Sequence, residues 1–159
     1  MIDPSQPCPC GKSTNERRLS YAQCCQPYHL GEVAPDPESL MRSRYSAFVL
    51  KCHQYLIDTH HPEFLNGLSV QLLDQENHTK WLGLSVDKTN STQNAGVVEF
   101  HAWFQDMDEL DAIHEISDFV KQDGRWYYTQ GKQLTPKYPK RNDPCVCQSG
   151  KKFKQCCLK

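Results

Sequence analysis

The chain contains, close to its C-terminal end, the stretch Asn142-Asp143-Pro144-Cys145-Val146-Cys147-Gln148-Ser149-Gly150-Lys151-Lys152-Phe153-Lys154-Gln155-Cys156-Cys157. Its four thiols form two close pairs with eight residues between them. Four soft ligands in one short segment suit a tetrahedral zinc ion, and iron could take the same set. A segment this short and polar cannot bury a core of its own. We therefore expect it to fold around a metal ion.

A related arrangement stands near the other end of the chain, where Cys8-Pro9-Cys10 precedes the adjacent pair Cys24-Cys25. The connector between these pairs has thirteen residues instead of eight and lacks the Ser-Gly step of the first stretch. In that step the serine and the backbone amides can hydrogen-bond thiolates. The preferred ligand set is Cys8, Cys10, Cys24 and Cys25. An alternative set has His29 in place of Cys25.

The cysteine count supports two metal sites. Eight of the nine cysteines fall in the two clusters, and Cys52 is left over. The first residues have neither the basic nor the apolar region of a secretory signal, and no apolar run approaches the ~18 residues that cross a bilayer. We therefore expect a cytoplasmic protein without a membrane span. In a reducing compartment, metal binding explains the cysteines better than disulfides do.

Charge is distributed unevenly along the chain. Residues 137–159 carry seven Lys or Arg against one acidic residue, whereas residues 30–136 carry eight basic and sixteen acidic residues. A basic end on an acidic body favours a polyanionic or acidic partner, such as RNA, a ribosome surface or an acidic protein patch. A solubilising tail around a small metal site is the simpler alternative.

The first half of the middle segment has helical periodicity. Pro35-Asp36-Pro37-Glu38 reads as a linker that also starts a helix, with Asp36 or Ser39 as N-cap. Apolar residues recur at three- and four-residue spacing from Ser39 to His53. A second short helix is predicted over 53–59 and a weaker third over 69–78.

From Lys80 onward the periodicity changes to two. Four strands are predicted, over 81–86, 95–104, 110–120 and 125–129, with turns at 89–94 and at Asp123-Gly124. Helices followed by consecutive antiparallel strands indicate an α+β fold, in which a curved sheet closes over the N-terminal helices as a cone.

Such a cone can enclose a pocket, so its polar residues are candidates for catalytic groups. The candidates are Arg42, Arg44, Tyr45, His60, His61, His101, His114 and Glu115. Arg42 and Arg44 cannot share one helical face. Neighbours on a strand point to opposite faces, so His114 and Glu115 cannot form an acid–base pair. No catalytic spacing emerges, and we expect a core without catalysis.

The C-terminal stretch resembles the SEC-C motif, first described at the C-terminus of the SecA preprotein translocase motor. The resemblance implies one structural zinc held by Cys145, Cys147, Cys156 and Cys157, and often a role in docking to partner proteins. SEC-C-like motifs at both ends, with Ala34-Pro35-Asp36-Pro37-Glu38-Ser39-Leu40-Met41-Arg42-Ser43-Arg44-Tyr45 between them, resemble the bacterial YchJ family. That likeness implies a cone similar to nuclear transport factors, flanked by metal modules. The family has no assigned biochemical activity, so the resemblance does not point to one.

Three units are thus predicted: a metal module over 1–34, a cone-like α+β domain over 35–136 and a second metal module over 137–159. The function expected is that of a zinc-binding adaptor, with a translocase- or ribosome-associated protein as partner. Two rival hypotheses remain: a ligand-binding or isomerase/hydratase-like enzyme that uses the cone, and RNA binding. The oligomeric state is not predicted.

Overall fold

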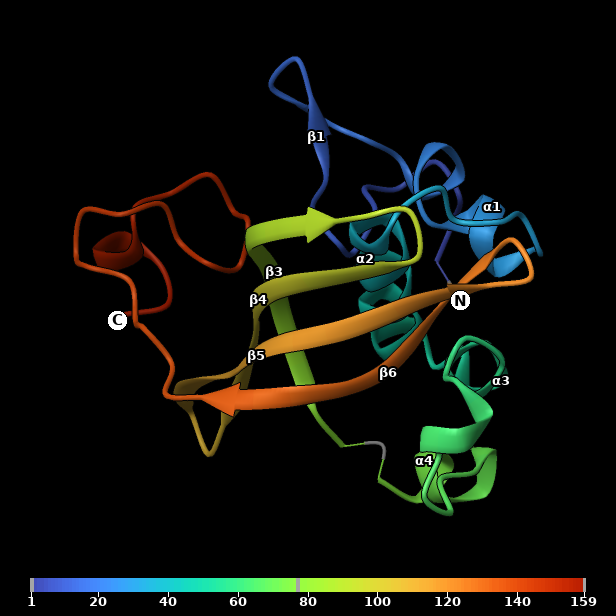
Figure 1. The fold of residues 1–159 in the computed structure, drawn as a ribbon. Coiled ribbons are helices and arrows are strands. Elements are labelled where there is room, and N and C mark those ends of the chain that lie inside the picture. Colours follow the sequence, from blue (N-terminus) through green and yellow to red (C-terminus); the bar gives the residue numbers. More distant parts are fainter. Residues whose placement is uncertain (1, 77, 159) are drawn as a thin grey trace.

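The fold was determined as a computed structural model that describes residues 2–76 and 78–158. Its centre is a four-stranded antiparallel sheet in the order β3-β4-β5-β6, which curves around one long helix (Figure 1). Consecutive strands pair throughout the sheet. The strands are β3 Lys80–Ser91, β4 Ala95–Asp106, β5 Glu109–Gln122 and β6 Arg125–Leu134.

The long helix α2, Pro37–Leu50, begins and ends at residues suited to those positions. The carboxylate of Asp36 accepts a hydrogen bond from the Ser39 amide at 2.7 Å, and Pro37 fills the first helical position. Lys51, with a left-handed φ of 63°, ends the helix. The predicted start is confirmed, but the helix stops before Cys52 and His53.

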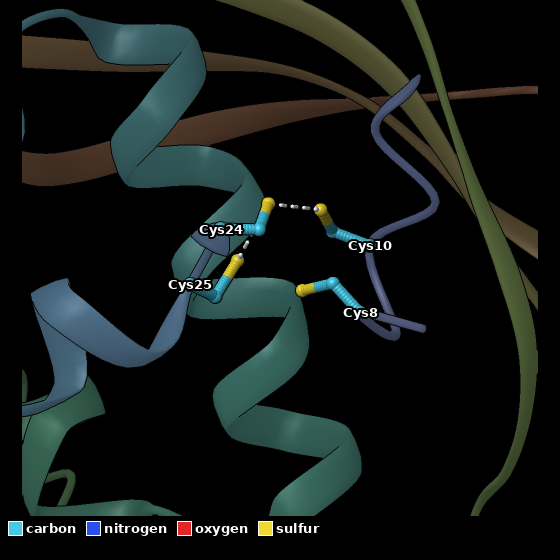
Figure 2. A group of neighbouring side chains, drawn as sticks. All are labelled: Cys8, Cys10, Cys24 and Cys25. Atoms are coloured by element: carbon cyan, nitrogen blue, oxygen red, sulfur yellow. Dashed lines mark hydrogen bonds between the residues drawn. The ribbon is translucent and has the colours of Figure 1, made fainter. Parts of the chain in front are cut away.

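The core lies between α2 and the inner face of the sheet. Leu40, Met41 and Tyr45 of the helix are buried with Val98 and Phe100 of β4. Phe119 and Trp126 belong to the same cluster. The four cysteines of the N-terminal cluster belong to the same group of buried residues, because the N-terminal segment packs on α2 (Figure 2).

Short elements fill in the remainder of the chain. Before α2 lie β1 Ser13–Thr14, β2 Arg17–Arg18, a 3₁₀ turn Tyr21–Gln23 and α1 Gln26–His29. Between α2 and the sheet lie α3 His53–Asp58, a 3₁₀ turn Pro62–Phe64 and α4 Val70–Gln75. After β6 the chain crosses to the side of the sheet, where it forms a small module with one 3₁₀ turn, Phe153–Gln155 (Figure 1).

The predicted α+β class is confirmed, and the differences concern the lengths of elements. β3 runs on to Ser91, so the turn that was expected over 89–94 is confined to the residues before Ala95. The register between β3 and β4 shifts after Trp81 and after Val86. Such irregularities interrupt the alternation of inward and outward side chains, so the sequence pattern underestimates the length of β3. β6 likewise extends past Thr129 to Leu134. Among the described residues, no helix is long and apolar enough to span a membrane.

Candidate metal centres

The first candidate centre gathers four buried cysteines from two loops. Cys8 and Cys10 precede β1, and Cys24 and Cys25 join the 3₁₀ turn to α1 (Figure 2). The sulfur of Cys24 lies 3.5 Å from that of Cys10 and 3.9 Å from that of Cys25. Four sulfurs at ~2.3 Å from a tetrahedral ion stand about 3.8 Å apart. The spacing therefore fits a metal tetrahedron and is too long for a disulfide.

The four thiols cannot all ionise in isolation. Hydrogen bonds among them lower the pKa of Cys8 and Cys10, and they raise that of Cys24 and Cys25, where burial acts in the same direction. A bound divalent cation would remove this conflict, because it favours the thiolate form of every ligand. The arrangement is therefore one that could hold a metal ion.

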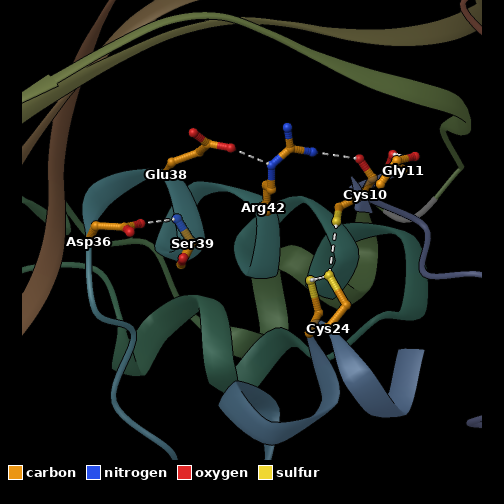
Figure 3. A network of polar contacts seen from close by, with 9 residues as sticks. Cys10, Gly11, Cys24, Asp36, Glu38, Ser39 and Arg42 are labelled. Carbon is orange, nitrogen blue, oxygen red and sulfur yellow. Dashed lines mark hydrogen bonds and ion pairs between the residues drawn. The ribbon is translucent and has the colours of Figure 1, made fainter. Parts of the chain in front are cut away.

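The middle domain completes the surroundings of this cluster. Ser46 of α2 donates a hydrogen bond to the Cys25 sulfur at 3.3 Å, and its oxygen lies 3.5 Å from the Cys8 sulfur. Arg42, paired with Glu38, donates to the Cys10 carbonyl at 3.0 Å (Figure 3). The hydroxyl replaces the serine that the N-terminal motif lacks, and the guanidinium offsets negative charge at the site.

The second candidate centre is more open to solvent. Cys145 is buried, whereas Cys147, Cys156 and Cys157 are half-buried, and the four ligand atoms lie within 4.8 Å of one another. The sulfurs of Cys147 and Cys156 stand 3.4 Å apart. Ser149 donates to the Cys156 sulfur at 3.4 Å, as the Ser-Gly step of the motif suggested. This site, unlike the first, draws its hydroxyl from its own connector.

The two modules share one backbone plan. In each, the residue after the Cys-x-Cys step has positive φ, and its backbone amide donates to the carbonyl of the first cysteine: Gly11 to Cys8 at 3.1 Å, and Gln148 to Cys145 at 3.2 Å. In each, an aromatic residue opens a 3₁₀ turn just before the cysteine pair. The sequence signal was present and was missed: Tyr21-Ala22-Gln23-Cys24-Cys25 matches Phe153-Lys154-Gln155-Cys156-Cys157.

The longer N-terminal connector forms the β1–β2 hairpin, and a residue of this hairpin contacts the C-terminal module. Arg18 of β2 donates to the Cys8 carbonyl at 2.9 Å and to the Gln148 side-chain oxygen at 2.8 Å. Two glycines leave room for this contact: the Gln148 side chain packs on Gly11, and the Val146 carbonyl packs on Gly83. A Cβ at Gly11 would lie 2.3 Å from Gln148 Nε2, and one at Gly83 would lie 2.1 Å from the Val146 oxygen. The two candidate centres thus belong to one packed unit.

His29 stands apart from the first cluster. Its Nε2 lies 2.8 Å from the Ser43 carbonyl and its Nδ1 lies 2.5 Å from the Tyr21 hydroxyl. Burial lowers its pKa. Both ring nitrogens therefore have partners outside the cysteine cluster, while Cys25 lies inside it. The geometry favours the four-cysteine set over the set with His29.

Two charged residues inside the cone, Arg44 and Glu115, form hydrogen bonds to other groups of the protein. Arg44, 5% exposed, donates to the Leu56 carbonyl at 2.9 Å and to Thr59 Oγ1 at 2.7 Å, and it lies over the Tyr128 ring. Burial lowers the pKa of Arg44 to about 10, so it stays charged near neutrality. Glu115 accepts hydrogen bonds from Tyr128, Ser117 and Gln133. Groups of the chain thus hold both charges in place.

The other candidates from the sequence lie in the core and at the end of α3. Tyr45 is buried against Trp81. His60 and His61 are buried at the end of α3, where the His61 ring contacts Gln122 at 2.9 Å. A cavity of about 270 Å³ lies at the rim of the cone between the N-terminal segment, α3 and the start of β6.

His60 and Arg44 meet at Tyr128: the His60 ring lies 5.0 Å from the Tyr128 ring centre, and the Arg44 guanidinium lies 4.8 Å from the same centre. Burial and the nearby Arg44 charge both lower the pKa of His60. Arg42 and His114 lie elsewhere, beside Cys10 and on the outer face of the sheet.

One group of titratable residues was not predicted as a group. His101 of β4 and His114 of β5 are directly opposite in the sheet register, and Asp87 of β3 and Glu99 of β4 lie beside them. They line a groove of about 790 Å³ between the outer sheet face and the C-terminal segment. His114 and Glu115 do point to opposite faces, as expected. The partners of His114 became visible only when the strand register was known.

Comparisons with known proteins agree with this architecture. Residues 36–131 match the family described as YchJ, middle NTF2-like domain, and residues 141–159 match the SEC-C motif. UPF0225 proteins of Shewanella sp. strains MR-4 and ANA-3 are 51% and 50% identical, each over 96% of both chains.

Two solved structures share the fold. A SEC-C motif containing protein from Psychrobacter arcticus has a TM-score of 0.73 at 35% identity and covers 99% of this chain and 98% of its own. A SEC-C motif containing protein from Rhodopseudomonas palustris has a TM-score of 0.72 at 32% identity and covers 81% of this chain and 99% of its own. The chain belongs to the YchJ family, with an NTF2-like middle domain and a SEC-C motif.

Proposed function

We propose that this protein is a cytoplasmic zinc-binding adaptor, whose C-terminal module presents a basic surface to a protein or ribonucleoprotein partner of export or translation. The observation that carries the proposal is the position of the basic residues on that module. Five of them are exposed around the C-terminal cluster: Lys137, Lys140, Arg141, Lys151 and Lys152. The four cysteines gather around one centre, while these cations face solvent.

The ligand chemistry supports a structural role for the metal. Each cluster offers four thiols, which would fill a tetrahedral ion completely and leave no position for water or substrate. Closed sites of this kind stabilise small folds, whereas catalytic zinc sites keep one position open. Zinc is the ion we propose for both clusters, and elemental analysis of the purified protein should find two zinc ions per chain. Iron in their place would reject this assignment.

The interior of the cone supports an adaptor over the enzyme alternative. The buried cation Arg44 and the buried carboxylate Glu115 are both held by groups of the chain. An enzyme of this shape needs a polar group free to meet substrate inside its pocket. Apolar side chains pack between α2 and the sheet, and the cavity of about 270 Å³ lies at the rim of the cone.

The test is a comparison of two charge-reversed variants with the wild type. Lys151→Glu with Lys152→Glu changes the basic face, and Lys121→Glu with Lys132→Glu makes the same change on exposed positions of the sheet. Tagged proteins are used to capture partners, which mass spectrometry identifies. We expect the first variant alone to lose enriched ribosomal or translocase proteins. Identical partner sets for both variants would contradict the proposal.

RNA binding is the second candidate, and the same basic residues favour it. Fluorescence anisotropy with a single-stranded RNA, measured from 50 to 200 mM salt, separates the two. Phosphate contacts by several lysines would make the affinity fall steeply with salt. If the wild type binds the RNA tightly and the variant Lys151→Glu with Lys152→Glu does not, RNA and not a protein is the partner of the basic surface.

A further inference from the structure

The segment that leads from β6 to the C-terminal module crosses the outer face of the sheet, where two histidines hold it. His101 and His114 are 4% and 2% exposed, and their rings stack at 3.9 Å between centroids with 16° between planes. Each ring contacts the crossing segment through one nitrogen and a carboxylate through the other. The four contacts determine which nitrogens carry protons.

The proton positions on His101 follow from its partners. The backbone amide of Lys137 donates to His101 Nε2 at 3.0 Å, so this nitrogen carries a lone pair. The other nitrogen, Nδ1, lies 2.7 Å from the Asp87 carboxylate and therefore carries the proton. His101 is thus a neutral ring with both nitrogens used.

His114 has a different requirement. Its Nδ1 lies 2.8 Å from the Thr135 carbonyl and its Nε2 lies 2.8 Å from the Glu99 carboxylate. Both partners are acceptors, so both contacts are hydrogen bonds only when both nitrogens carry protons. Only the imidazolium form of His114 satisfies this geometry.

The same positions resemble a metal site of two histidines and one carboxylate. The ligand atoms of Asp87, His101 and His114 lie within 4.8 Å of one another. A metal ion needs a lone pair on each histidine. His101 cannot supply one, because Lys137 occupies Nε2 and Nδ1 must then carry the proton. The hydrogen bonds therefore argue against metal at this place.

We propose that His114 acts as a proton-dependent clamp, which fastens the segment before the C-terminal module while it is doubly protonated and loosens it when one proton leaves. The neutral ring can donate to Thr135 or to Glu99 but not to both. Its free lone pair then faces an acceptor at 2.8 Å. That repulsion, together with the lost hydrogen bond, acts directly on the crossing segment.

The surrounding charges support the protonated state at low pH. Burial lowers the pKa of His114, but the hydrogen bonds to Thr135 and Glu99 and the carboxylate charges outweigh it, and the net shift is upward. The stabilisation is thus complete below the ordinary histidine pKa of about 6.5 and is lost as the pH rises through the raised value. The other charged or titratable groups around the groove are Asp87, Lys88, His101, Lys137, Tyr138 and Asp143.

Hydrogen exchange of the metal-loaded full chain tests the clamp. Protection of peptides covering residues 134–141 is measured from pH 6 to pH 9 and corrected for the intrinsic rate. In the wild type we expect it to fall about tenfold or more as the pH rises, because a charge-assisted hydrogen bond is lost. Peptides of α2 serve as the internal reference. Protection that does not change with pH would overturn the proposal.

Two variants separate the clamp from ordinary packing. In Glu99→Gln the amide can donate to neutral His114, so protection should persist at pH 9. In His114→Phe the ring remains but the protons do not, so protection should be low at every pH. Equal pH profiles for wild type and Glu99→Gln would overturn the proposal. Elemental analysis gives a second check. A third zinc ion in the wild type that is absent from His101→Gln would also overturn the proposal.

Discussion

Replacing Gly83 with alanine should undock the C-terminal module from the sheet. The new Cβ would lie 2.1 Å from the backbone oxygen of Val146, and ordinary contact begins near 3.4 Å, so the loop must retreat by about 1.3 Å. A backbone atom cannot rotate away as a side chain can. A shift of that size also breaks the 2.8 Å hydrogen bond between Arg18 and Gln148. The change therefore acts first on the contact between β3 and the C-terminal module, at the turn that carries Cys145 and Cys147.

The expected magnitude follows from the cost of overpacking, about 1–3 kcal/mol. This corresponds to a shift of about 5- to 140-fold in the equilibrium between docked and undocked module. Trypsin digestion under native conditions measures this equilibrium. Trypsin cuts after Lys and Arg, and the module offers the exposed sites Lys140, Arg141, Lys151 and Lys152. The initial rate of cleavage there should rise by a factor within that range.

The control is Asn90→Ala, an exposed position at the far end of the same strand. It should leave cleavage of the module unchanged. The reasoning is refuted if Gly83→Ala is cut at the wild-type rate and keeps the wild-type melting temperature. That result would mean that the Val146 loop does not rest on β3 in solution.

Three further predictions concern the metal sites and the interior. Ser46→Ala should release metal from the N-terminal cluster to a chelator about tenfold faster, since it removes the hydroxyl at Cys25, while the C-terminal cluster is unaffected. Chelation of both ions should unfold the two terminal modules and leave the sheet, as seen by hydrogen exchange; modules that remain protected would contradict metal-dependent folding. Arg44→Met should lower the free energy of unfolding by about 2–4 kcal/mol in urea titration, because it leaves the Leu56 carbonyl and Thr59 without their buried donor.

The sequence was most informative where chemistry depends on local spacing. Cysteine pairs with a short connector predicted both clusters, and Asp36 and Asp123-Gly124 predicted a helix start and a hairpin turn. These features arise from residues within a few positions of one another, so no tertiary information is needed. The predicted domain bounds and the role of the cysteines as ligands stay predictions.

The features that were missed depend on residues brought together by the fold. Ser46 lies twenty-one positions beyond Cys25, and nothing in α2 distinguishes it from other helix serines. The His101–His114 stack needs the register of β4 and β5, which strand periodicity does not supply. Gln148 gave no signal either, because its partners Gly11 and Gly83 are distant in sequence.

The source of the serine hydroxyl at each cluster has a consequence for transplanting the modules into other proteins. The C-terminal stretch carries Ser149 within its own connector, so a graft of this stretch would keep its hydroxyl. The N-terminal stretch borrows Ser46 from the long helix and buries its cysteines against it. Grafted alone, it would lose both a hydrogen bond and its apolar cover. Of two motifs with a common plan, one carries its own serine hydroxyl and the other depends on α2 for it.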